Sequence, residues 1–311
     1  MKKLFIKCTL YIFFIIIALE LVVRVFHLYK DVPIRYIDAY DVEKSLPNQT
    51  GFAVTGNRRQ NYSEYHINSF GFNSYRDFQP SDDKTEIALV GDSFIEGMHQ
   101  NYSNSIGKKI EGLLKNVEVY EYGYAGYDLA NQLYLIQAYQ EHFKAIDHII
   151  FYIKYNNDLD NSAYTPNYQR IKLLKSPLFK IRDEFKLLAY ASAIGIVDPI
   201  KDMAINIIKE KPKSVSESEE RDKDLKKLEN FKSLINTFGF DKNKMAFLLN
   251  SKTSSPLFLE YCRENGYPII DFALPFENSK EPPTLIYDLH WNNHGRTIIA
   301  NVVADFIKAK K

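Results

Sequence analysis

Five short apolar runs that alternate with segments of helical spacing constrain the fold of this chain most strongly. The apolar runs cover residues 86–90, 117–120, 147–155, 245–250 and 267–272. The segments of helical spacing cover residues 105–114, 129–143, 256–265 and 293–308. Strands that alternate with helices of this length predict an α/β domain with a parallel sheet covered on both faces. Right-handed crossovers then bring the loops after successive strands to one edge, where such sheets bind ligands.

The N-terminus contains an apolar run long enough to cross a membrane. Residues 4–23 give the roughly 20 residues that a helix needs to span a bilayer core, with Glu20 near the end of the run. Lysines at positions 2, 3 and 7 favour a cytoplasmic N-terminus. We therefore expect residues 1–29 to form a single-pass anchor, with the rest of the chain periplasmic or extracellular.

Two other interpretations of this run are a cleaved signal peptide and a buried core helix. The stretch LELVVRVFHLY offers no A-x-A-like cleavage site. A core helix would leave the three lysines unexplained. The uncleaved anchor therefore fits the sequence best.

Charge and cysteine content exclude several classes of protein. The 311 residues contain 40 Lys and Arg against 39 Asp and Glu, a net charge of +1, so a nucleic-acid partner is not expected. The two cysteines, Cys8 and Cys262, cannot form a disulfide framework or a zinc site of cysteines.

Two regions lie outside the alternating pattern. Residues 30–83 have no steady period, and we expect an irregular lead-in segment with short strands, either packed on the main domain of residues 84–311 or leading out from the membrane. Residues 160–243 interrupt the alternation and are interpreted as a helical insertion, for which a lid is one possible role. The stretch 214–227 within it is dense in charge, which is typical of a solvated helix or a mobile loop.

A serine follows the first apolar run directly. Ser93 stands in GDSFIEG, between the predicted strand and the next helix, so we expect its side chain at the sheet edge near the positive end of a helix dipole. That position favours a developing alkoxide and lets a backbone N–H face an oxyanion. The alternative is a plain helix N-cap, since Ser and Asp both cap helices well.

One of the seven histidines has a carboxylate in a favourable position. Asp288 lies two residues before His290, and in an extended segment both side chains point to the same side. Asp288 can then fix the imidazole tautomer of a base for the serine. A metal site needs further clustered ligands, and only His294 lies nearby, so neither a metal nor another cofactor is expected.

Acyl transfer also needs donors for the oxyanion. Gly123 or Gly126, after the second strand, can present a backbone N–H, and Asn157, after the third, can present its amide from a polar loop. A turn glycine and a turn asparagine are the simpler interpretations of each residue alone. Their joint placement with Ser93 and the Asp–His pair, at the ends of one sheet, favours a serine acyl-transfer site.

Four segments resemble the blocks of the SGNH (GDSL-type) hydrolases, in that family's order. They are GDSF at 91–94, YGYAGYD at 122–128, YNND at 155–158 and DLHW at 288–291. The resemblance implies a flavodoxin-like three-layer αβα sandwich with a five-stranded parallel sheet, which cleaves or transfers acyl esters. It implies a triad of Ser93 as nucleophile, His290 as base and Asp288 as acid. The oxyanion hole would be completed by Gly123 or Gly126 and by Asn157.

Three positions depart from the family pattern. Tyr155 replaces the glycine of the third block, and Glu121 stands where the second block usually has asparagine. The last block is Asp-x-His-Trp in place of Asp-x-x-His. This shorter form is similar to a membrane-linked or periplasmic branch associated with acetylation of bacterial polysaccharides. The upstream segment NSFGF at 68–72 is similar to one in anchored bacterial members.

These features favour a membrane-anchored serine esterase or O-acyltransferase that acts on acyl esters, acetyl esters above all, of an extracytoplasmic polysaccharide. Its partners would be an acylated glycan or other acyl ester, the membrane, and the machinery of polysaccharide synthesis. One alternative is a lipid or thioester hydrolase of the same fold that uses the anchor to reach membrane substrates. Another is a non-catalytic glycan-binding or assembly protein that retains the fold.

Overall fold

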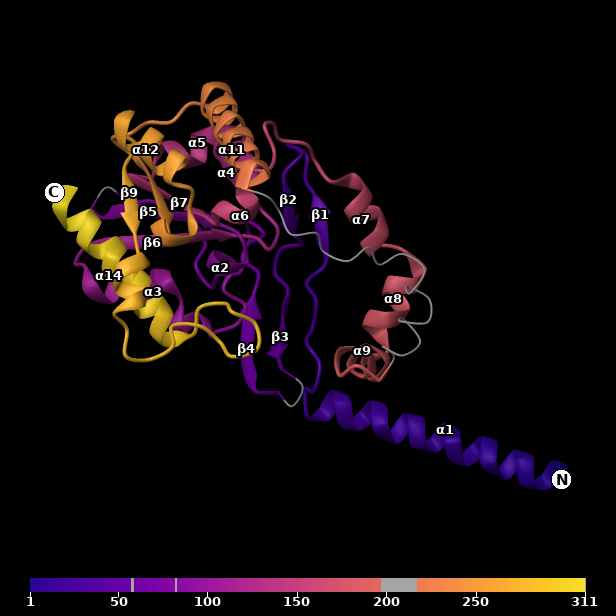
Figure 1. Ribbon diagram of the computed structural model, residues 1–311. Coiled ribbons are helices and arrows are strands. Elements are labelled where there is room, and N and C mark those ends of the chain that lie inside the picture. The colour runs from indigo at the N-terminus through magenta and orange to yellow at the C-terminus, as the bar shows by residue number, and fades with distance from the viewer. Residues whose placement is uncertain (57–58, 82, 197–216, 311) are drawn as a thin grey trace.

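A five-stranded parallel sheet forms the centre of the computed structural model, which describes residues 1–56, 59–81, 83–196 and 217–310 (Figure 1). Its strand order is β6-β5-β7-β8-β9, and every neighbouring pair is parallel. Numbered along the chain, this is the order 2-1-3-4-5 of the flavodoxin-like fold. The predicted five-stranded parallel sheet is therefore confirmed. The strands are β5 (Thr85–Gly91), β6 (Val117–Gly123), β7 (His148–Ile153), β8 (Met245–Leu249) and β9 (Ile269–Asp271).

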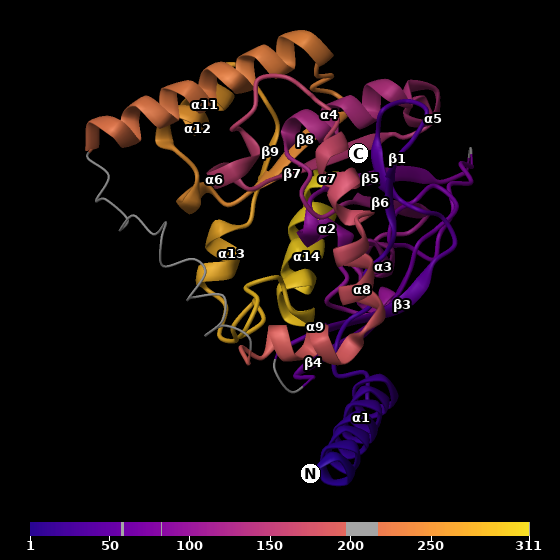
Figure 2. The same ribbon diagram turned by 90° about the vertical axis from the view of Figure 1, so that its right-hand side faces the viewer.

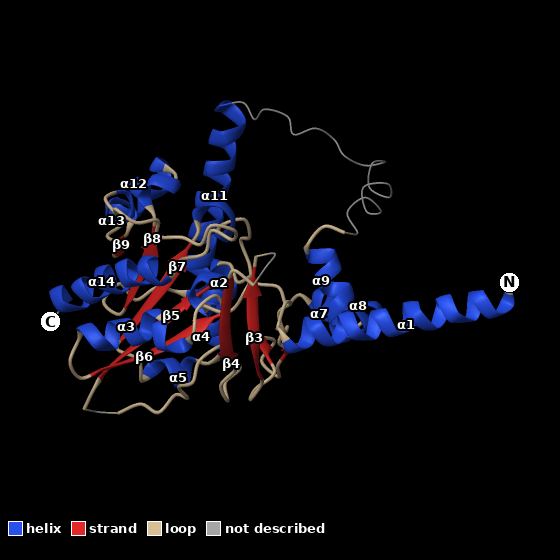
Figure 3. Ribbon diagram, turned by 90° about the horizontal axis from the view of Figure 1, so that it is seen from below, coloured by secondary structure: helices blue, strands red, loops and turns tan. Residues whose placement is uncertain are grey.

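Helices cover both faces of the sheet, because the side chains of each strand alternate between two apolar cores (Figure 3). Ile87 and Leu89 of β5 belong to the core on the side of α3 (Ile106–Leu113) and α14 (Asn293–Lys310). Ala88 and Val90 belong to the opposite core. That second face is covered by α4 (Leu129–Ala138), α5 (Gln140–Lys144), α11 (Glu217–Phe238) and α12 (Pro256–Glu264).

Several short helices complete the domain. They are α2 (Ser93–Glu96), α13 (Ala273–Glu277) and two 3-10 turns, η1 (Tyr102–Asn104) and η2 (Ser251–Thr253). The whole is a three-layer αβα sandwich.

Residues 30–83 form two small hairpins outside the main sheet. β1 (Arg35–Ile37) pairs with β2 (Glu43–Ser45), and β3 (Thr50–Thr55) pairs with β4 (Asn61–His66), both in antiparallel fashion. Figure 1 shows these hairpins beside the carboxyl edge of the main sheet. The lead-in segment therefore contributes to the surroundings of that edge.

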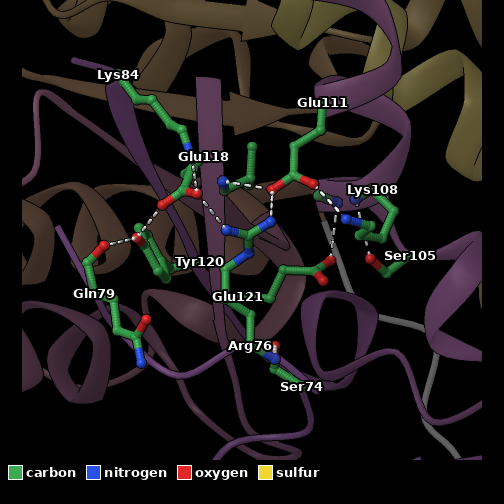
Figure 4. Close-up of polar contacts among 12 residues, drawn as sticks. Ser74, Arg76, Gln79, Lys84, Ser105, Lys108, Glu111, Glu118, Tyr120 and Glu121 are labelled. Atoms are coloured by element: carbon green, nitrogen blue, oxygen red, sulfur yellow. Dashed lines mark hydrogen bonds and ion pairs between the residues drawn. The ribbon is translucent and has the colours of Figure 1, made fainter. Parts of the chain in front are cut away.

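An ion-pair network joins the end of the lead-in segment to α3 and β6 (Figure 4). Arg76 lies between two carboxylates, 2.7 Å from Glu111 of α3 and 2.9 Å from Glu118 of β6. Lys84 also contacts Glu118, and Lys108 lies 2.6 Å from Glu111. Charges in a shared, half-buried network are screened less than those of an isolated surface pair. The network fixes the lead-in segment beside β6.

One helical turn precedes the insertion of residues 160–243, and further helices form within it. α6 (Tyr155–Asp158) is a single helical turn where the sequence predicts a polar loop, and α7 (Tyr168–Leu174), α8 (Pro177–Glu184) and α9 (Lys186–Ala193) follow it. α11 then packs on the sheet. Of the charge-dense stretch, residues 214–216 lie outside the described residues and the rest forms the first turns of α11.

α1 (Lys2–Val25) extends away from the domain as a single helix whose side chains are almost all exposed (Figure 1). It is long and apolar enough to cross a membrane. Its 24 residues correspond to about 36 Å, against about 30 Å for a hydrocarbon core. The end of α1 that joins the domain lies beside α9 (Figure 2).

Candidate active site

Ser93 lies at the carboxyl edge of the sheet, directly after β5. β5 ends at Gly91, and α2 begins at Ser93. The Asp92 carboxylate caps α2 by accepting a hydrogen bond of 2.9 Å from the N–H of Phe94. Glycine is needed at position 91, because a Cβ there would lie 2.5 Å from the side chain of Ile95. This tight strand-to-helix turn presents the Ser93 hydroxyl at the edge of the sheet.

A chain of hydrogen bonds joins Ser93 to His290 and Asp288. Ser93 Oγ lies 2.7 Å from His290 Nε2, and His290 Nδ1 contacts a carboxylate oxygen of Asp288. An ionised carboxylate only accepts hydrogen bonds, so we place the proton of the neutral imidazole on Nδ1. Nε2 is then the atom that can accept the Ser93 proton. This arrangement can activate a serine as a nucleophile.

Asp288 and His290 are brought together by a turn, although the sequence predicts an extended segment. Leu289 between them has a φ of +62°, in the left-handed region that is uncommon for a bulky side chain. Its side chain is exposed, whereas those of its two neighbours face Ser93 and each other. The turn thus serves the same purpose as the expected extended segment, at a cost in backbone strain.

A second histidine contacts Asp288. His99 Nε2 lies 2.9 Å from Asp288 Oδ2, and the His99 ring stacks on His290 with centroids 4.0 Å apart. Burial lowers the pKa of His99 to about 4, so His99 is neutral near pH 7 and donates from Nε2. This residue could not be predicted from the sequence, because 189 residues separate it from its carboxylate and no local motif marks it.

The two histidines hold Asp288 in its charged form. Burial opposes ionisation of this carboxyl, but the two histidines outweigh that effect and lower the pKa of Asp288. Both carboxylate oxygens accept a hydrogen bond, one from each histidine. Asp288 is therefore fixed in orientation as well as in charge.

The same three residues form the group of potential metal ligands that the described part of the chain contains. Their facing atoms are already engaged with one another, since Asp288 accepts from both His99 and His290. A cation would have to replace both hydrogen bonds and would compete with Ser93 for His290. A metal bound by these residues would therefore break the hydrogen bonds that join Ser93, His290 and Asp288.

The expected oxyanion donors lie in three different environments. Gly123, the last residue of β6, packs so closely on α2 that a Cβ would lie 1.9 Å from the backbone nitrogen of Glu96. Gly126 has a φ of +102° and faces Arg170. The Asn157 side chain is exposed on α6, and no hydrogen bond described in the structure joins it to Ser93. Of the three, only Gly123 directly adjoins the helix that Ser93 begins.

The two residues that depart from the family pattern support the surrounding structure. The Glu121 carboxylate is buried and accepts a hydrogen bond of 3.1 Å from the N–H of Gly107, in the first turn of α3. The Tyr155 hydroxyl donates to Asp224 of α11 at 2.7 Å, and its ring packs 5.5 Å from that of Phe258. Both side chains thus have structural partners away from Ser93.

Two buried carboxyl groups, those of Asp92 and Asp158, influence each other. Asp158 is fully buried, and its Oδ2 accepts a hydrogen bond of 2.8 Å from the N–H of Lys154, while Oδ1 has no partner among the described residues. Burial, together with the nearby charge of Asp92, raises the pKa of Asp158 well above its usual value. The raised pKa favours the neutral acid, which avoids an unpaired buried charge.

Ser93 opens into a cavity of about 570 Å³, a size typical of small-molecule sites. One wall contains Ser93, His99, Asp288 and His290. The lining also includes residues 28–33, which lie shortly after α1, and Tyr190 and Ala193 of α9. Ser93 and the segments near the apolar helix therefore line the same cavity.

Comparisons with solved structures find several proteins with distant similarity to this chain. No family model matches the chain, and no curated protein matches it. A lipase/acylhydrolase from Enterococcus faecalis is similar, with 12% identity and a TM-score of 0.41 over 72% of this chain and 96% of its own. A psychrotrophic esterase EstA from Pseudoalteromonas sp. has 11% identity and a TM-score of 0.41 over 73% of this chain and 98% of its own.

A third similar structure is a member of the lipolytic G-D-S-L family from Veillonella parvula. It has 15% identity and a TM-score of 0.35 over 72% of this chain and 98% of its own. These identities and TM-scores are low. The chemistry of this chain therefore rests on its own strand order and the geometry around Ser93.

Proposed function

We propose that this chain is a membrane-anchored serine esterase or O-acyltransferase of the SGNH type. The observation that carries the proposal is the continuous hydrogen-bonded chain Ser93–His290–Asp288 at the carboxyl edge of a 2-1-3-4-5 sheet. The four SGNH-like blocks lie at or near that edge and occur in the family's order. Anchoring is supported by α1, the helix that is long and apolar enough to cross a membrane.

The mechanism follows from the hydrogen-bond pattern. His290 Nε2 accepts the proton of Ser93, whose Oγ forms a bond to the acyl carbonyl carbon. The bond from that carbon to the leaving oxygen breaks, and His290 returns the proton to the leaving group. Water or an acceptor hydroxyl then attacks the acyl-enzyme by the same steps in reverse. Asp288 stabilises the transient imidazolium, and His99 keeps Asp288 in place.

Backbone donors near α2 stabilise the oxyanion in this proposal. The N–H of Ser93 and that of Gly123 are assigned to it, because Gly123 packs against the helix that begins at Ser93. Asn157 would need to turn inward when substrate binds, since its side chain is exposed. Gly126 is the weaker alternative to Gly123.

The proposed substrate is an acyl ester, above all an acetyl ester, of an extracytoplasmic glycan. Support for the glycan comes from the Asp-x-His-Trp block and from segment 68–72, both similar to anchored bacterial members. Polysaccharide-synthesis proteins would then be its partners. A second candidate, a lipid or thioester hydrolase, is favoured by one observation: residues that follow α1 form a wall of the cavity.

A fluorophosphonate probe tests the nucleophile directly. The wild-type chain should be labelled at Ser93, and Ser93→Ala should not be labelled. Equal labelling of the two proteins would place the nucleophile elsewhere. The absence of label on both would favour the non-catalytic binding protein. An acylated glycan that forms only when an acceptor sugar is present would identify transfer over hydrolysis.

A further inference from the structure

The joining end of α1 and the helix α9 form an apolar groove outside the Ser93 cavity. Its lining includes Phe13, Ile17 and Leu21 of α1 together with Phe185, Leu188 and Ala191, and its volume is about 560 Å³. The α1 residues belong to the run that is apolar enough to span a bilayer. Because α9 lines the same groove, its apolar side chains lie level with the second half of that span.

Glu20 explains how α9 is held at this position. Its carboxylate accepts hydrogen bonds from the backbone N–H groups of Lys186, at 3.1 Å, and Leu187, at 2.7 Å. Arg24 lies 2.7 Å from the same carboxylate and also donates to the carbonyl of Glu184. The one acidic residue of the apolar run thus satisfies the first N–H groups of α9. A charged residue is costly within a membrane span. In this chain the charge of Glu20 fixes α9 to α1.

The segment from α7 to α9 has the composition of a helix surface that binds membranes. Large apolar side chains are exposed along it, with Ile181, Phe185 and Leu188 each about half exposed. Between residues 168 and 196 there are six Lys or Arg against two Asp or Glu, in a chain whose overall charge is only +1. Apolar side chains beside basic ones favour the interface of an anionic bilayer.

α9 also connects this groove to the catalytic cavity. Phe185, Leu188 and Ala191 line the groove, whereas Tyr190 and Ala193 of the same helix line the cavity that contains Ser93. Residues 28–33, shortly after α1, also line that cavity. One short helix therefore separates the reacting serine from the surface that faces the bilayer.

We propose that α9, together with the adjoining half of α1, docks the domain on the bilayer, and that the Ser93 cavity takes an amphiphilic acyl ester from that bilayer. The occupant of the apolar groove is lipid. The docking stands on the α1–α9 contacts alone, whereas the substrate class rests on the proposed function of Ser93. A glycan acceptor remains compatible with a lipid donor.

Depth-dependent quenching tests the docking without any measurement of activity. In the full chain with Cys8→Ser, Leu188→Cys would take a single NBD label, since Cys262 is fully buried. The matched control is Leu225→Cys, a position of similar exposure on α11. Vesicles of phosphatidylcholine and phosphatidylglycerol that contain doxyl-labelled lipid should quench the label at 188 at least about twofold more than the label at 225. Equal quenching at the two positions would overturn the docking.

A comparison of two esters tests the substrate class. The full chain in the same vesicles should show a kcat/KM about tenfold higher for p-nitrophenyl palmitate in the bilayer than for soluble p-nitrophenyl acetate. Equal values, both abolished in Ser93→Ala, would overturn the lipid substrate and leave the esterase. Turnover of neither ester by the wild type would overturn the proposed function and the substrate class together. The quenching result would still decide the docking.

Discussion

At the scale of single residues, Asp288 is the group on which the site depends most. Each of its carboxylate oxygens accepts a hydrogen bond from a different histidine, and those two histidines stack on each other. His290 is placed to exchange a proton with Ser93, while His99 contacts only the carboxylate and the ring of its neighbour. His99 therefore acts in our account by positioning Asp288.

Replacing His99 should slow the chemical step. His99→Phe keeps a ring to stack on His290 but removes the donor to Asp288, so the carboxylate becomes less well oriented. We expect kcat to fall roughly tenfold with little change in KM. His99→Gln, which retains a donor, should recover part of the loss. Steady-state ester hydrolysis measures both constants, with His66→Phe on β4 as a control away from the cavity. An unchanged kcat in His99→Phe would show that the second hydrogen bond is dispensable.

The pKa of His99 predicts how stability changes with pH. The pKa of about 4 in the folded state lies below the ordinary value of 6.5, so the unfolded chain binds more protons between these limits. Stability should therefore fall as pH drops from 6.5 to 4, with about 3 kcal/mol of the loss at pH 4 due to His99. Urea unfolding at pH 7 and pH 4.5 measures this loss. The free energy of unfolding should fall less between the two pH values in His99→Phe than in the wild type. The pKa of His142 is also about 4, so part of the pH dependence of stability should remain in His99→Phe.

The sequence identifies some residues of this site and not others, for a physical reason. Ser93, Asp288 and His290 stand in local motifs, and the structure brings the three within hydrogen-bonding distance, while their catalytic roles remain predictions. His99 has no motif, because its function depends on a contact with a residue far along the chain. The Asn157 side chain cannot be placed from a motif alone, since its exposure depends on the helical turn of α6.

At the scale of elements, α11 is a structural layer and not a lid over the cavity. Its Phe231 is fully buried and packs against Phe247 of β8 and Phe258 of α12. The charge-dense start of the helix predicts a solvated segment. Further along the helix, however, apolar residues recur at helical spacing, at Leu228, Phe231 and Leu234. That later periodicity is the sequence signal by which this layer could have been recognised.

Truncation of Phe231 should therefore destabilise the whole domain. Phe231→Ala leaves a cavity between α11 and the sheet, and we expect a loss of about 3–5 kcal/mol in the free energy of unfolding. Leu225→Ala, on an exposed face of the same helix, should change it by no more than about 0.5 kcal/mol. Chemical denaturation followed by far-UV circular dichroism measures both. Similar small effects of the two changes would indicate that α11 is only loosely attached.

The alternating strands and helices were predictable because their periodicity is local, and all five strands occur near their expected ranges. The hairpins of residues 35–66 were harder to predict, because their side chains do not alternate cleanly between a buried and an exposed face. Their position is fixed by contacts such as the hydrogen bond from the Tyr124 hydroxyl to Glu43, at 2.6 Å.

At the scale of the whole molecule, α1 should hold the chain in a membrane. The full chain should remain in the membrane pellet after alkaline carbonate extraction, because carbonate removes peripheral proteins but not a spanning helix. The chain that starts at residue 30 should enter the supernatant, even if α9 still touches the bilayer at neutral pH. Immunoblots of the two fractions provide the measurement. Release of the full chain by carbonate would contradict a membrane-spanning α1.

The central claim is that Ser93 forms an acyl-enzyme, and a burst experiment tests it most directly. The full chain in detergent would be mixed with p-nitrophenyl acetate, and nitrophenol release and intact mass would be followed for the wild type and Ser93→Ala. We predict a burst of about one nitrophenol per protein and a matching acetyl adduct in the wild type, with both absent in Ser93→Ala. A burst and adduct of equal size in the two proteins, or neither in the wild type, would contradict the account.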